Sequence, residues 1–523
     1  MVVEAGAASP WRPRRHVGPA QLPTPGRCVP PATPHLPIHL SRRLREATVA
    51  GHTVLLVRNG TEFSALGSRC PHHGAPLSRG VLKGKRLRCP WHGACFNIKT
   101  GDIEEYPALD CLPCFKVNSC SHVPLPAPSQ TSTLSCTRSR ERSGCHSQRR
   151  PGGSSSLVGV AALVCAETLR QEGFTGRIIM ATKEKHSPYD RSKLSKVCVD
   201  ACLIFTSYLL LQAVSVDFQR QKVRFKNGSS QKYNHLLIAT GSHPNPLEVP
   251  GADLQNICLL QTPEDSSKIL ELATGKNLVI IGASFVGMEI AAFLSDKAAA
   301  ISVVEKKEFP FQNVLGSQVG GVAMKMLQNK GVKFYMKTKL SELKGKDGKV
   351  SHSFAACVLA PFPTGASPSS AFLKGTSIAR DSSGAILVDL LMQTNIPNVF
   401  AAGDVVSFPV ALLNGKQSSI HHQQVAEAHG HIAALNMLKK QKELHTVPFF
   451  WTTMLGKSIR YAGCGEGYTD TVVKGSLEQL EFLIFYIRDG YVVAAASLNC
   501  DPMVSLIAEV LCSGKQISKE EAE

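Results

Sequence analysis

The chain has 523 residues, 43% of them hydrophobic, and a formal net charge of +18. A chain of this length is expected to form several domains, each with its own hydrophobic core. Its basic residues are not interleaved with aromatic residues, and none of its apolar runs is long enough to span a membrane, so we predict neither nucleic-acid binding nor an integral membrane segment.

The N-terminal segment, residues 1–36, is rich in Arg and Pro, and we expect it to be disordered. Glu4 is the only acidic residue before Glu46, a composition compatible with a mitochondrial presequence. The prolines, however, weaken an amphipathic helix. We therefore predict a mitochondrial location, with the cytoplasm as the alternative.

Residues 37–118 contain short alternating apolar runs separated by Gly and Asn turns, which predict a small all-β domain. Within it, two motifs each combine one thiol with one imidazole: Cys70-Pro-His72 and Cys89-Pro-Trp-His92. Sixteen residues separate His72 from Cys89. In a Rieske [2Fe–2S] centre two Cys hold one iron and two His hold the other, so we predict this cluster. A structural zinc site with the same four ligands is the alternative.

The residues around these ligands resemble the Rieske family, because each motif runs into a glycine, His73-Gly74 and His92-Gly93. High-potential members of that family carry two extra cysteines that link the ligand loops. The corresponding positions here are Ala75 and Trp91. The resemblance is therefore to the low-potential, soluble, ferredoxin-like branch.

Residues 119–156 are rich in Ser, Pro and Arg, and we predict a linker. From residue 157 onward strands alternate with helical patterns, which predicts parallel α/β sheets. The longest apolar run, residues 201–216, contains Ser, Thr and Gln and is expected to be a buried helix or a pair of strands.

Residues 271–385 contain a predicted dinucleotide-binding unit. A buried strand, 276–281, leads into a turn and an apolar helix, and a second strand, 300–304, ends at Glu305. The turn follows the pattern G-x-G-x-x-G with serine at the middle glycine: Gly282, Ser284 and Gly287. The pyrophosphate is expected at the N-terminus of the helix. Glu305 is expected to accept hydrogen bonds from the ribose and to repel a 2′-phosphate, which favours NADH over NADPH.

Further segments resemble the FAD-binding parts of the pyridine-nucleotide-dependent flavoprotein reductases, in residues 157–270 and 386–437. The resemblance assigns these residues to FAD: Glu184, Arg191, Lys196, Thr240, Gly241, Gly403, Asp404 and, from the C-terminal part, Trp451. It also pairs Lys196 with Glu289 beside the reactive edge of the flavin. A cation there would steady negative charge as hydride arrives, so this pair is the predicted catalytic one. A domain-interface ion pair is the structural alternative.

The first FAD fingerprint departs from the expected strand, G-x-G-x-x-G turn and helix. Gly159 and Ala162 match the pattern, but Leu157 stands where the first glycine is expected, and its side chain would oppose the tight turn. Two other segments depart from the family: residues 197–216 are short, and residues 351–371 lack the expected strand and Gly-rich turn.

The order of these parts, ending in a C-terminal domain at 438–523, resembles the Rieske-bearing, apoptosis-inducing-factor-like flavoproteins of mitochondria. The resemblance implies a multidomain fold: an all-β Rieske domain, an α/β FAD- and NAD-binding reductase with two Rossmann-like domains, and a C-terminal α+β domain. It implies an oxidoreductase that passes electrons from NADH through FAD to the [2Fe–2S] cluster, and an association with cell death. The sequence does not identify the electron acceptor, and a homodimer is one option for the assembly. The alternative is a non-catalytic or signalling Rieske protein with a degenerate flavin site.

Overall fold

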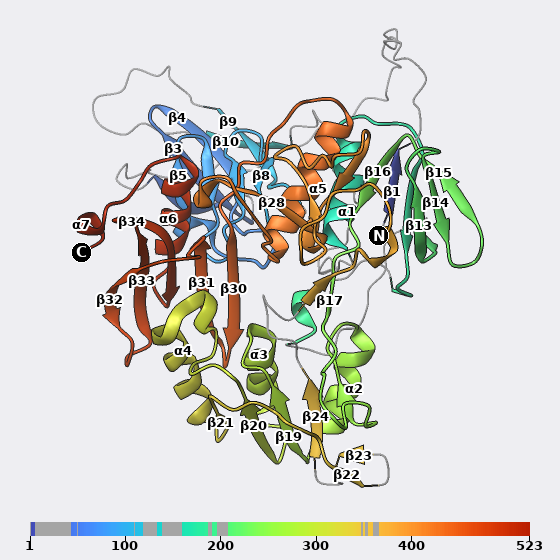
Figure 1. Ribbon diagram of the computed structural model, residues 1–523. Coiled ribbons are helices and arrows are strands. Elements are labelled where there is room, and N and C mark those ends of the chain that lie inside the picture. Colours follow the sequence, from blue (N-terminus) through green and yellow to red (C-terminus); the bar gives the residue numbers. More distant parts are fainter. Residues whose placement is uncertain are drawn as a thin grey trace, which may run out of the picture.

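The structure is a computed structural model of the 523-residue chain. It describes residues 2–5, 43–49, 51–108, 110–118, 133–138, 159–186, 191–195, 208–346, 349–350, 354–358 and 366–523. We call residues 37–118 the Rieske part, 157–270 with 386–437 the FAD part, 271–385 the NAD part and 438–523 the C-terminal part. Figure 1 shows the Rieske part in blue between the C-terminal part in red and the FAD part in green and orange.

The Rieske part contains two antiparallel sheets. The larger has the order β10-β9-β4-β3-β2 and the smaller the order β5-β6-β7-β8. Their strands are β2 (Leu44–Val49), β3 (His52–Asn59), β4 (Glu62–Gly67), β5 (Val81–Lys83), β6 (Arg86–Arg88), β7 (Cys95–Asn97), β8 (Ile103–Glu105), β9 (Cys114–Asn118) and β10 (Thr133–Arg138). Leu55, Leu66 and Phe96 are fully buried between the sheets, as the alternating runs predicted.

Strand β10 departs from the sequence analysis, which assigned Thr133–Arg138 to a linker. It pairs antiparallel with β9 at the edge of the larger sheet. The run Thr-Leu-Ser-Cys-Thr contains two β-branched threonines, a residue type that is enriched in strands, although its surroundings are Ser-rich. The remaining predicted linker residues lie outside the described ranges.

The FAD part is built on a five-stranded sheet with the order β12-β11-β1-β16-β27. Its strands are β1 (Val2–Ala5), β11 (Ile178–Thr182), β12 (Tyr208–Leu210), β16 (His235–Ile238) and β27 (Val399–Ala401). Helices α1 (Val160–Gln171) and α5 (Gln423–Met437) cover it and contact each other closely: a Cβ on Gly430 would lie 2.0 Å from the carbonyl oxygen of Ala161. The glycine therefore sets how near the two helices approach.

Strand β1 also departs from the sequence analysis, which placed residues 2–5 in a disordered segment. Val2–Ala5 pairs with both β11 and β16, and both pairings are antiparallel. The position between these strands is the one that the expected first strand of the FAD fingerprint would take, in parallel orientation. Local composition did not reveal this long-range pairing.

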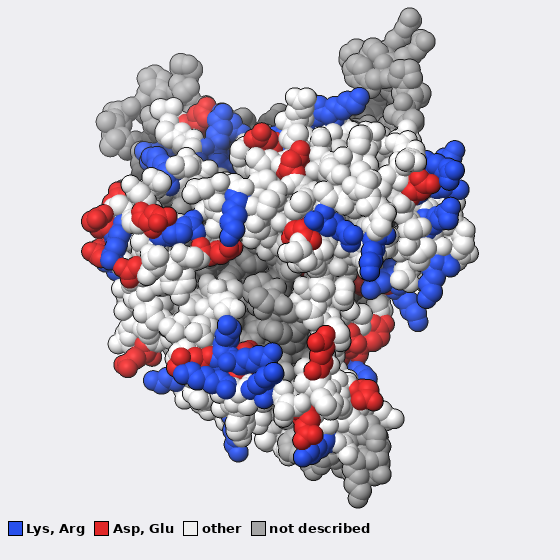
Figure 2. Space-filling view, viewed as in Figure 1, with Lys and Arg blue, Asp and Glu red and all other residues white. Residues whose placement is uncertain are grey.

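The predicted apolar run 201–216 is described from residue 208 onward. It contributes β12 and the first residues of β13 (Ala213–Asp217), which is followed by β14 (Lys222–Phe225) and β15 (Ser230–Lys232) in a separate antiparallel sheet. Lys and Arg gather over these last three strands, at the right edge of the face in Figure 2. Over the rest of that face, Lys and Arg lie among Asp and Glu. Among the residues that the structure describes, no helix is long and apolar enough to cross a membrane.

The NAD part contains a parallel sheet with the order β18-β24-β19-β20-β21. Its elements are β18 (Ile257–Cys258), α2 (Pro263–Ala273), β19 (Asn277–Ile281), α3 (Phe285–Leu294), β20 (Ala300–Val304), α4 (Gln312–Gln328), β21 (Lys333–Tyr335) and β24 (Phe354–Val358). Strand β18 and most of α2 precede residue 271, but they pair with or contact β24 of this sheet. Strand β24 corrects the expectation that residues 351–371 lack a strand. Its run Phe-Ala-Ala-Cys-Val is short and continuous, as is typical of parallel strands, and so offers no alternation to detect.

The C-terminal part is an antiparallel sheet with the order β30-β31-β34-β33-β32, followed by two helices. Its elements are β30 (Phe449–Met454), β31 (Lys457–Gly463), β32 (Asp470–Ser476), β33 (Glu481–Arg488), β34 (Tyr491–Leu498), α6 (Met503–Cys512) and α7 (Lys519–Ala522). Strand β30 contacts α3 of the NAD part and α5 of the FAD part, while α6 contacts β5 of the Rieske part. The C-terminal part thus touches all three other parts.

Candidate functional site

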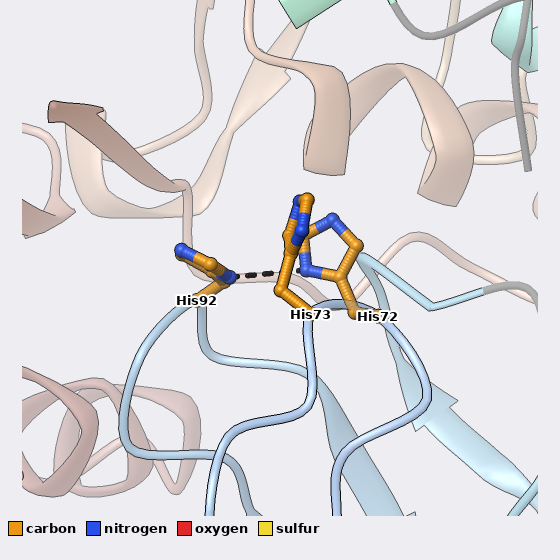
Figure 3. Close-up of side chains that lie close together, drawn as sticks. All are labelled: His72, His73 and His92. Carbon is orange, nitrogen blue, oxygen red and sulfur yellow. Dashed lines mark hydrogen bonds between the residues drawn. The ribbon is translucent and has the colours of Figure 1, made fainter. Parts of the chain in front are cut away.

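The four predicted cluster ligands lie on two loops of the Rieske part, and Figure 3 shows the two predicted histidine ligands, His72 and His92, with His73 beside them. Loop 1, residues 70–77, follows β4, and loop 2, residues 89–94, joins β6 to β7. Cys70 and Cys89 are buried, and the Nδ1 atoms of His72 and His92 lie 3.1 Å apart. The structure therefore brings together the two thiols and the two imidazoles that the spacing singled out.

Glycine is required at the turn of each loop. Gly74 and Gly93 have φ angles of 74° and 77°, in the left-handed region that side chains rarely adopt. A Cβ on Gly93 would also lie 2.7 Å from the ring of Phe449 on β30. Loop 2 is thus pressed against the C-terminal part.

The donor chemistry fits an iron–sulfur cluster. Burial, then the neighbouring His73 and Lys193, lower the pKa of His72 to about 3, so its imidazole is neutral, which is the form that binds metal. The hydrogen bond from Cys89, followed by burial, raises the pKa of the Cys70 thiol, which shows that the two sulfurs are adjacent. Metal binding requires these thiols to release their protons.

A third imidazole, His73, belongs to the same group. Ligand atoms of His72, His73 and His92 all lie within 4.8 Å of one another. The sequence spacing did not select His73, and its side chain is exposed while that of His92 is buried. Adjacent histidines in a sequence leave open which of them is a ligand.

Trp451 of β30 lies directly beside the histidines of this site. Its ring centroid is 4.0 Å from that of His92, with 35° between the planes, and 5.3 Å from that of His72. The family resemblance placed Trp451 near the flavin. The structure adds that the same side chain contacts a predicted cluster ligand.

The predicted dinucleotide turn lies between β19 and α3. The hydroxyl of Ser284 accepts a hydrogen bond from the Gly287 N–H at 3.3 Å, so the serine caps the helix. A Cβ on Gly287 would lie 2.2 Å from the carbonyl oxygen of Gly282, which itself has a φ of 99°. Both glycines are therefore needed to seat α3 against the turn.

Glu305 reaches back to this turn from the end of β20. Its carboxylate accepts hydrogen bonds from the Ala283 N–H at 2.8 Å and the Lys307 N–H at 3.1 Å. The acid is thus held at the position where the fingerprint expects the ribose.

Glu289, in the first turns of α3, is buried between the NAD and C-terminal parts. It accepts hydrogen bonds from the hydroxyl of Ser195 and, at 2.7 Å, from that of Thr452. Lys196, its predicted partner, lies outside the described residues. Ser195 directly precedes the predicted Lys196, but the sequence analysis assigned no role to Ser195 or to Thr452.

The residues assigned to FAD lie at the ends of the FAD-part strands. Glu184 follows β11 and forms an ion pair with Arg191, although the resemblance gave these two residues separate roles. Asp404 follows β27 and accepts a hydrogen bond from Ser242 Oγ at 3.2 Å, which brings it beside Thr240 and Gly241. The two segments meet because β16 and β27 are parallel neighbours.

Helix α1 begins at Gly159, whose φ of 61° needs a glycine, and Ala162 is fully buried against the FAD-part core. Leu157, the expected departure, lies outside the described residues. Several buried polar atoms nearby have no hydrogen-bond partner among the described residues: Thr240 Oγ1, His422 Nδ1 and His429 Nε2. Such atoms fit a site that a polar cofactor completes.

His429 of α5 was not predicted as a site residue. Its Nδ1 accepts a hydrogen bond from the Gly403 N–H at 3.3 Å, and its ring lies 4.5 Å from that of Phe408. Burial lowers the pKa of His429 to about 3, so the ring is neutral. The one sequence feature that could have pointed to His429 as a site residue is its position in an apolar helix.

Three family patterns match the chain in the order of its parts. Residues 36–116 match the Rieske [2Fe-2S] domain, 158–430 the pyridine nucleotide-disulphide oxidoreductase family and 449–523 the reductase C-terminal domain. Together they span the site just described.

The chain also resembles individual proteins of known sequence or structure. It is 45% identical to apoptosis-inducing factor 3 of Mus musculus over 97% of this chain and 87% of that protein. It is 27% identical to the biphenyl dioxygenase system ferredoxin–NAD(+) reductase component of Paraburkholderia xenovorans, over 70% of this chain and 94% of that protein. The covalent putidaredoxin reductase–putidaredoxin complex shares the fold, with a TM-score of 0.65 and 21% identity over 69% of this chain and 93% of that one.

Proposed function

The chain belongs to the pyridine nucleotide-disulphide oxidoreductase family, and on that premise we propose that it passes electrons from NADH through FAD to a Rieske [2Fe–2S] cluster. One observation carries this proposal: the predicted cluster ligand His92 contacts Trp451 of the reductase C-terminal domain within the same chain. The relatives named as ferredoxin–NAD(+) reductases support the direction of electron flow.

NADH would be held by the turn between β19 and α3. Gly282 and Gly287 leave room for the pyrophosphate at the helix N-terminus, where backbone N–H groups and the helix dipole favour an anion. The Glu305 carboxylate would accept from the ribose hydroxyls, and its charge would repel the 2′-phosphate of NADPH.

FAD converts a two-electron hydride donor into a source of single electrons, which is what a [2Fe–2S] cluster accepts. The chain's own residues would orient it. Asp404 and Thr240 would hydrogen-bond its polar groups, and Arg191 with Lys196 would supply positive charge near it. Buried Glu289, fixed by Ser195 and Thr452, would hold Lys196 in place.

At the other end of the path, Cys70 and Cys89 would hold one iron and His72 and His92 the other. The neutral imidazole of His72 suits this role. Trp451 lies against His92 and would shield it from water. Electrons would then leave toward an acceptor that remains to be identified.

A direct experiment uses the purified full-length protein. We expect about one extractable flavin per chain, bleaching of its absorbance by NADH under anaerobic conditions, and the electron paramagnetic resonance signal of a reduced Rieske cluster. NADPH should be less effective. Bleaching of flavin without cluster reduction would contradict the proposed electron path.

The alternative, a non-catalytic or signalling Rieske protein, is favoured by Leu157 in the first FAD fingerprint. The same preparation decides between them, because that alternative predicts a cluster without stoichiometric flavin.

A role in apoptosis, a mitochondrial location and a homodimer are part of the proposal. Fusion of residues 1–50 to a fluorescent protein and size-exclusion chromatography would test the last two.

A further inference from the structure

In loop 2 of the Rieske part, the backbone carbonyls of every second residue, three in all, accept hydrogen bonds from side chains. Cys89 O accepts from Ser505 Oγ at 2.9 Å, Trp91 O from Arg460 Nε at 2.9 Å and Gly93 O from Arg88 Nη1 at 2.8 Å. Ser505 belongs to α6 and Arg460 to β31, so two of the three donors come from the C-terminal part.

The third donor is also tied to the C-terminal part. Arg88, on β6, donates from Nε to Glu509 of α6 at 2.7 Å and forms an ion pair with Glu105 at 2.9 Å. Arg88 is 1% exposed and Glu509 2% exposed. Although burial opposes its ionisation, the Arg88 and Arg86 guanidiniums hold the pKa of Glu509 below its usual value. The buried carboxylate of Glu509 in α6 thus orients Arg88, which donates a hydrogen bond to loop 2.

In loop 1 the Cys70 N–H donates to Ala75 O at 2.9 Å and the Gly74 N–H donates to Cys70 O at 2.8 Å, both within the loop. The side chains of the C-terminal part therefore act on the loop that carries His92, the ligand that contacts Trp451. In Figure 1 helix α6 lies beside β5, at the boundary between the red and blue parts.

We propose that Ser505, Arg460 and Glu509 are positioning residues that hold loop 2, and with it the cluster, in one electron-receiving pose on the C-terminal part. This inference rests on the proposed function. It gives a new role to three residues outside the cofactor motifs: they dock the chain's own electron acceptor, the cluster, on the C-terminal part. Buried hydrogen bonds to backbone carbonyls suit this task, because each carbonyl left without its donor remains desolvated. Electron delivery should then depend on residues that lie outside both cofactor motifs in the sequence.

The test uses the full-length holoprotein with Ser505→Ala, Arg460→Lys and both together. Ser513→Ala is the matched control, because its hydroxyl donates to Val510 O at the C-terminal end of the same helix and not to loop 2. Two quantities are measured: amide hydrogen exchange of a peptide covering residues 86–98, and anaerobic stopped-flow reduction of the cluster by NADH. Each reduction rate is normalised to the same protein's NADH–ferricyanide rate, which needs flavin but not the cluster.

We expect exchange in the double variant to be about tenfold faster and cluster reduction about tenfold slower, as for other misplaced reacting groups. The control should match the wild type in both. Values within twofold of wild type for both quantities, at full iron content, would overturn the proposal. If the double variant loses iron, the Ser505→Ala variant alone decides by the same two criteria.

The failure of the proposed function is a separate result. If NADH does not reduce the cluster of the wild-type protein, the electron path is wrong. The hydrogen exchange of loop 2 still tests the docking, because it requires no electron transfer.

Discussion

The ring of His92 lies against the ring of Trp451, with centroids 4.0 Å apart, although the two residues are 359 positions apart in the chain. One residue is a predicted cluster ligand in a β-domain loop, and the other is in the first strand of the reductase C-terminal domain. The contact joins the two halves of the proposed electron path.

Replacement of Trp451 should slow electron arrival at the cluster. We expect Trp451→Ala to reduce the rate of cluster reduction by NADH at least about tenfold, because the space beside His92 would fill with water and the geometry would loosen. Trp451→Phe should fall in between. Tyr491→Ala, at an exposed aromatic residue of the same sheet, is the control. An unchanged rate in Trp451→Ala, measured by stopped-flow, would rule out this role.

The charge of Glu305 should set the preference for NADH. Glu305→Gln keeps an oxygen that can accept from the Ala283 N–H but removes the charge that repels a 2′-phosphate. We expect the ratio of kcat/KM for NADH over NADPH to fall about tenfold, equivalent to about 1.4 kcal/mol. Glu308→Gln, a nearby exposed residue paired with Lys337, should leave the ratio unchanged.

Gly287 should be indispensable to the NAD turn. In Gly287→Ala the new Cβ would lie 2.2 Å from Gly282 O, so α3 must shift. We expect a loss of about 1–3 kcal/mol in the free energy of unfolding and weakened NADH binding at normal flavin content. The matched control is Gly321→Ala in α4, where the nearest atom would be 3.7 Å away. Equal stability of the two variants, measured by denaturant unfolding, would contradict this account.

The sequence predicted the features that neighbouring residues determine. The spacing from Cys70 to His92 and the turn from Gly282 to Gly287 are local, because each ligand loop or helix start is built by residues within a few positions. The family resemblance extended this to the order of the parts. These predictions concern single strands, turns and helices.

The features that the sequence did not predict depend on pairing across long distances. Strand β24 has no alternation, and β1 joins its sheet from the far end of the chain in antiparallel orientation. The hydrogen bond from Ser505 to Cys89 O spans 416 positions, and the sequence around neither residue contains a pattern that predicts this contact. Such contacts follow from the packing of one part against another.

Two histidines of the FAD part, the buried His429 and the partly buried His422, should make the fold sensitive to acid. Burial lowers the pKa of His422 and of His429 to about 3. An unfolded histidine titrates near pH 6.5, so between pH 6.5 and 3 the unfolded chain binds more protons. Each histidine should therefore cost about 1.4 kcal/mol of stability per pH unit as the pH falls through this window. Above pH 6.5 this loss should be absent.

The variant His429→Gln isolates one of these contributions. Its amide oxygen can still accept from the Gly403 N–H but does not titrate in this range. The pH dependence of its unfolding free energy between pH 6.5 and 4 should be shallower than that of the wild type by about one proton. Parallel curves for the two proteins would show that His429 is already protonated in the folded state.

The two adjacent histidines of loop 1 should differ in their importance for the cluster. His72 Nδ1 faces His92 Nδ1 at 3.1 Å, as expected for two ligands of one iron, whereas His73 is exposed. We expect His72→Ala to lose iron and the Rieske resonance, and His73→Ala to retain about two irons per chain. Metal analysis of both variants tests this and the zinc alternative together. Loss of iron in His73→Ala with retention of iron in His72→Ala would show that His73 and not His72 is the ligand. Zinc in place of iron in the wild type would contradict the predicted [2Fe–2S] cluster.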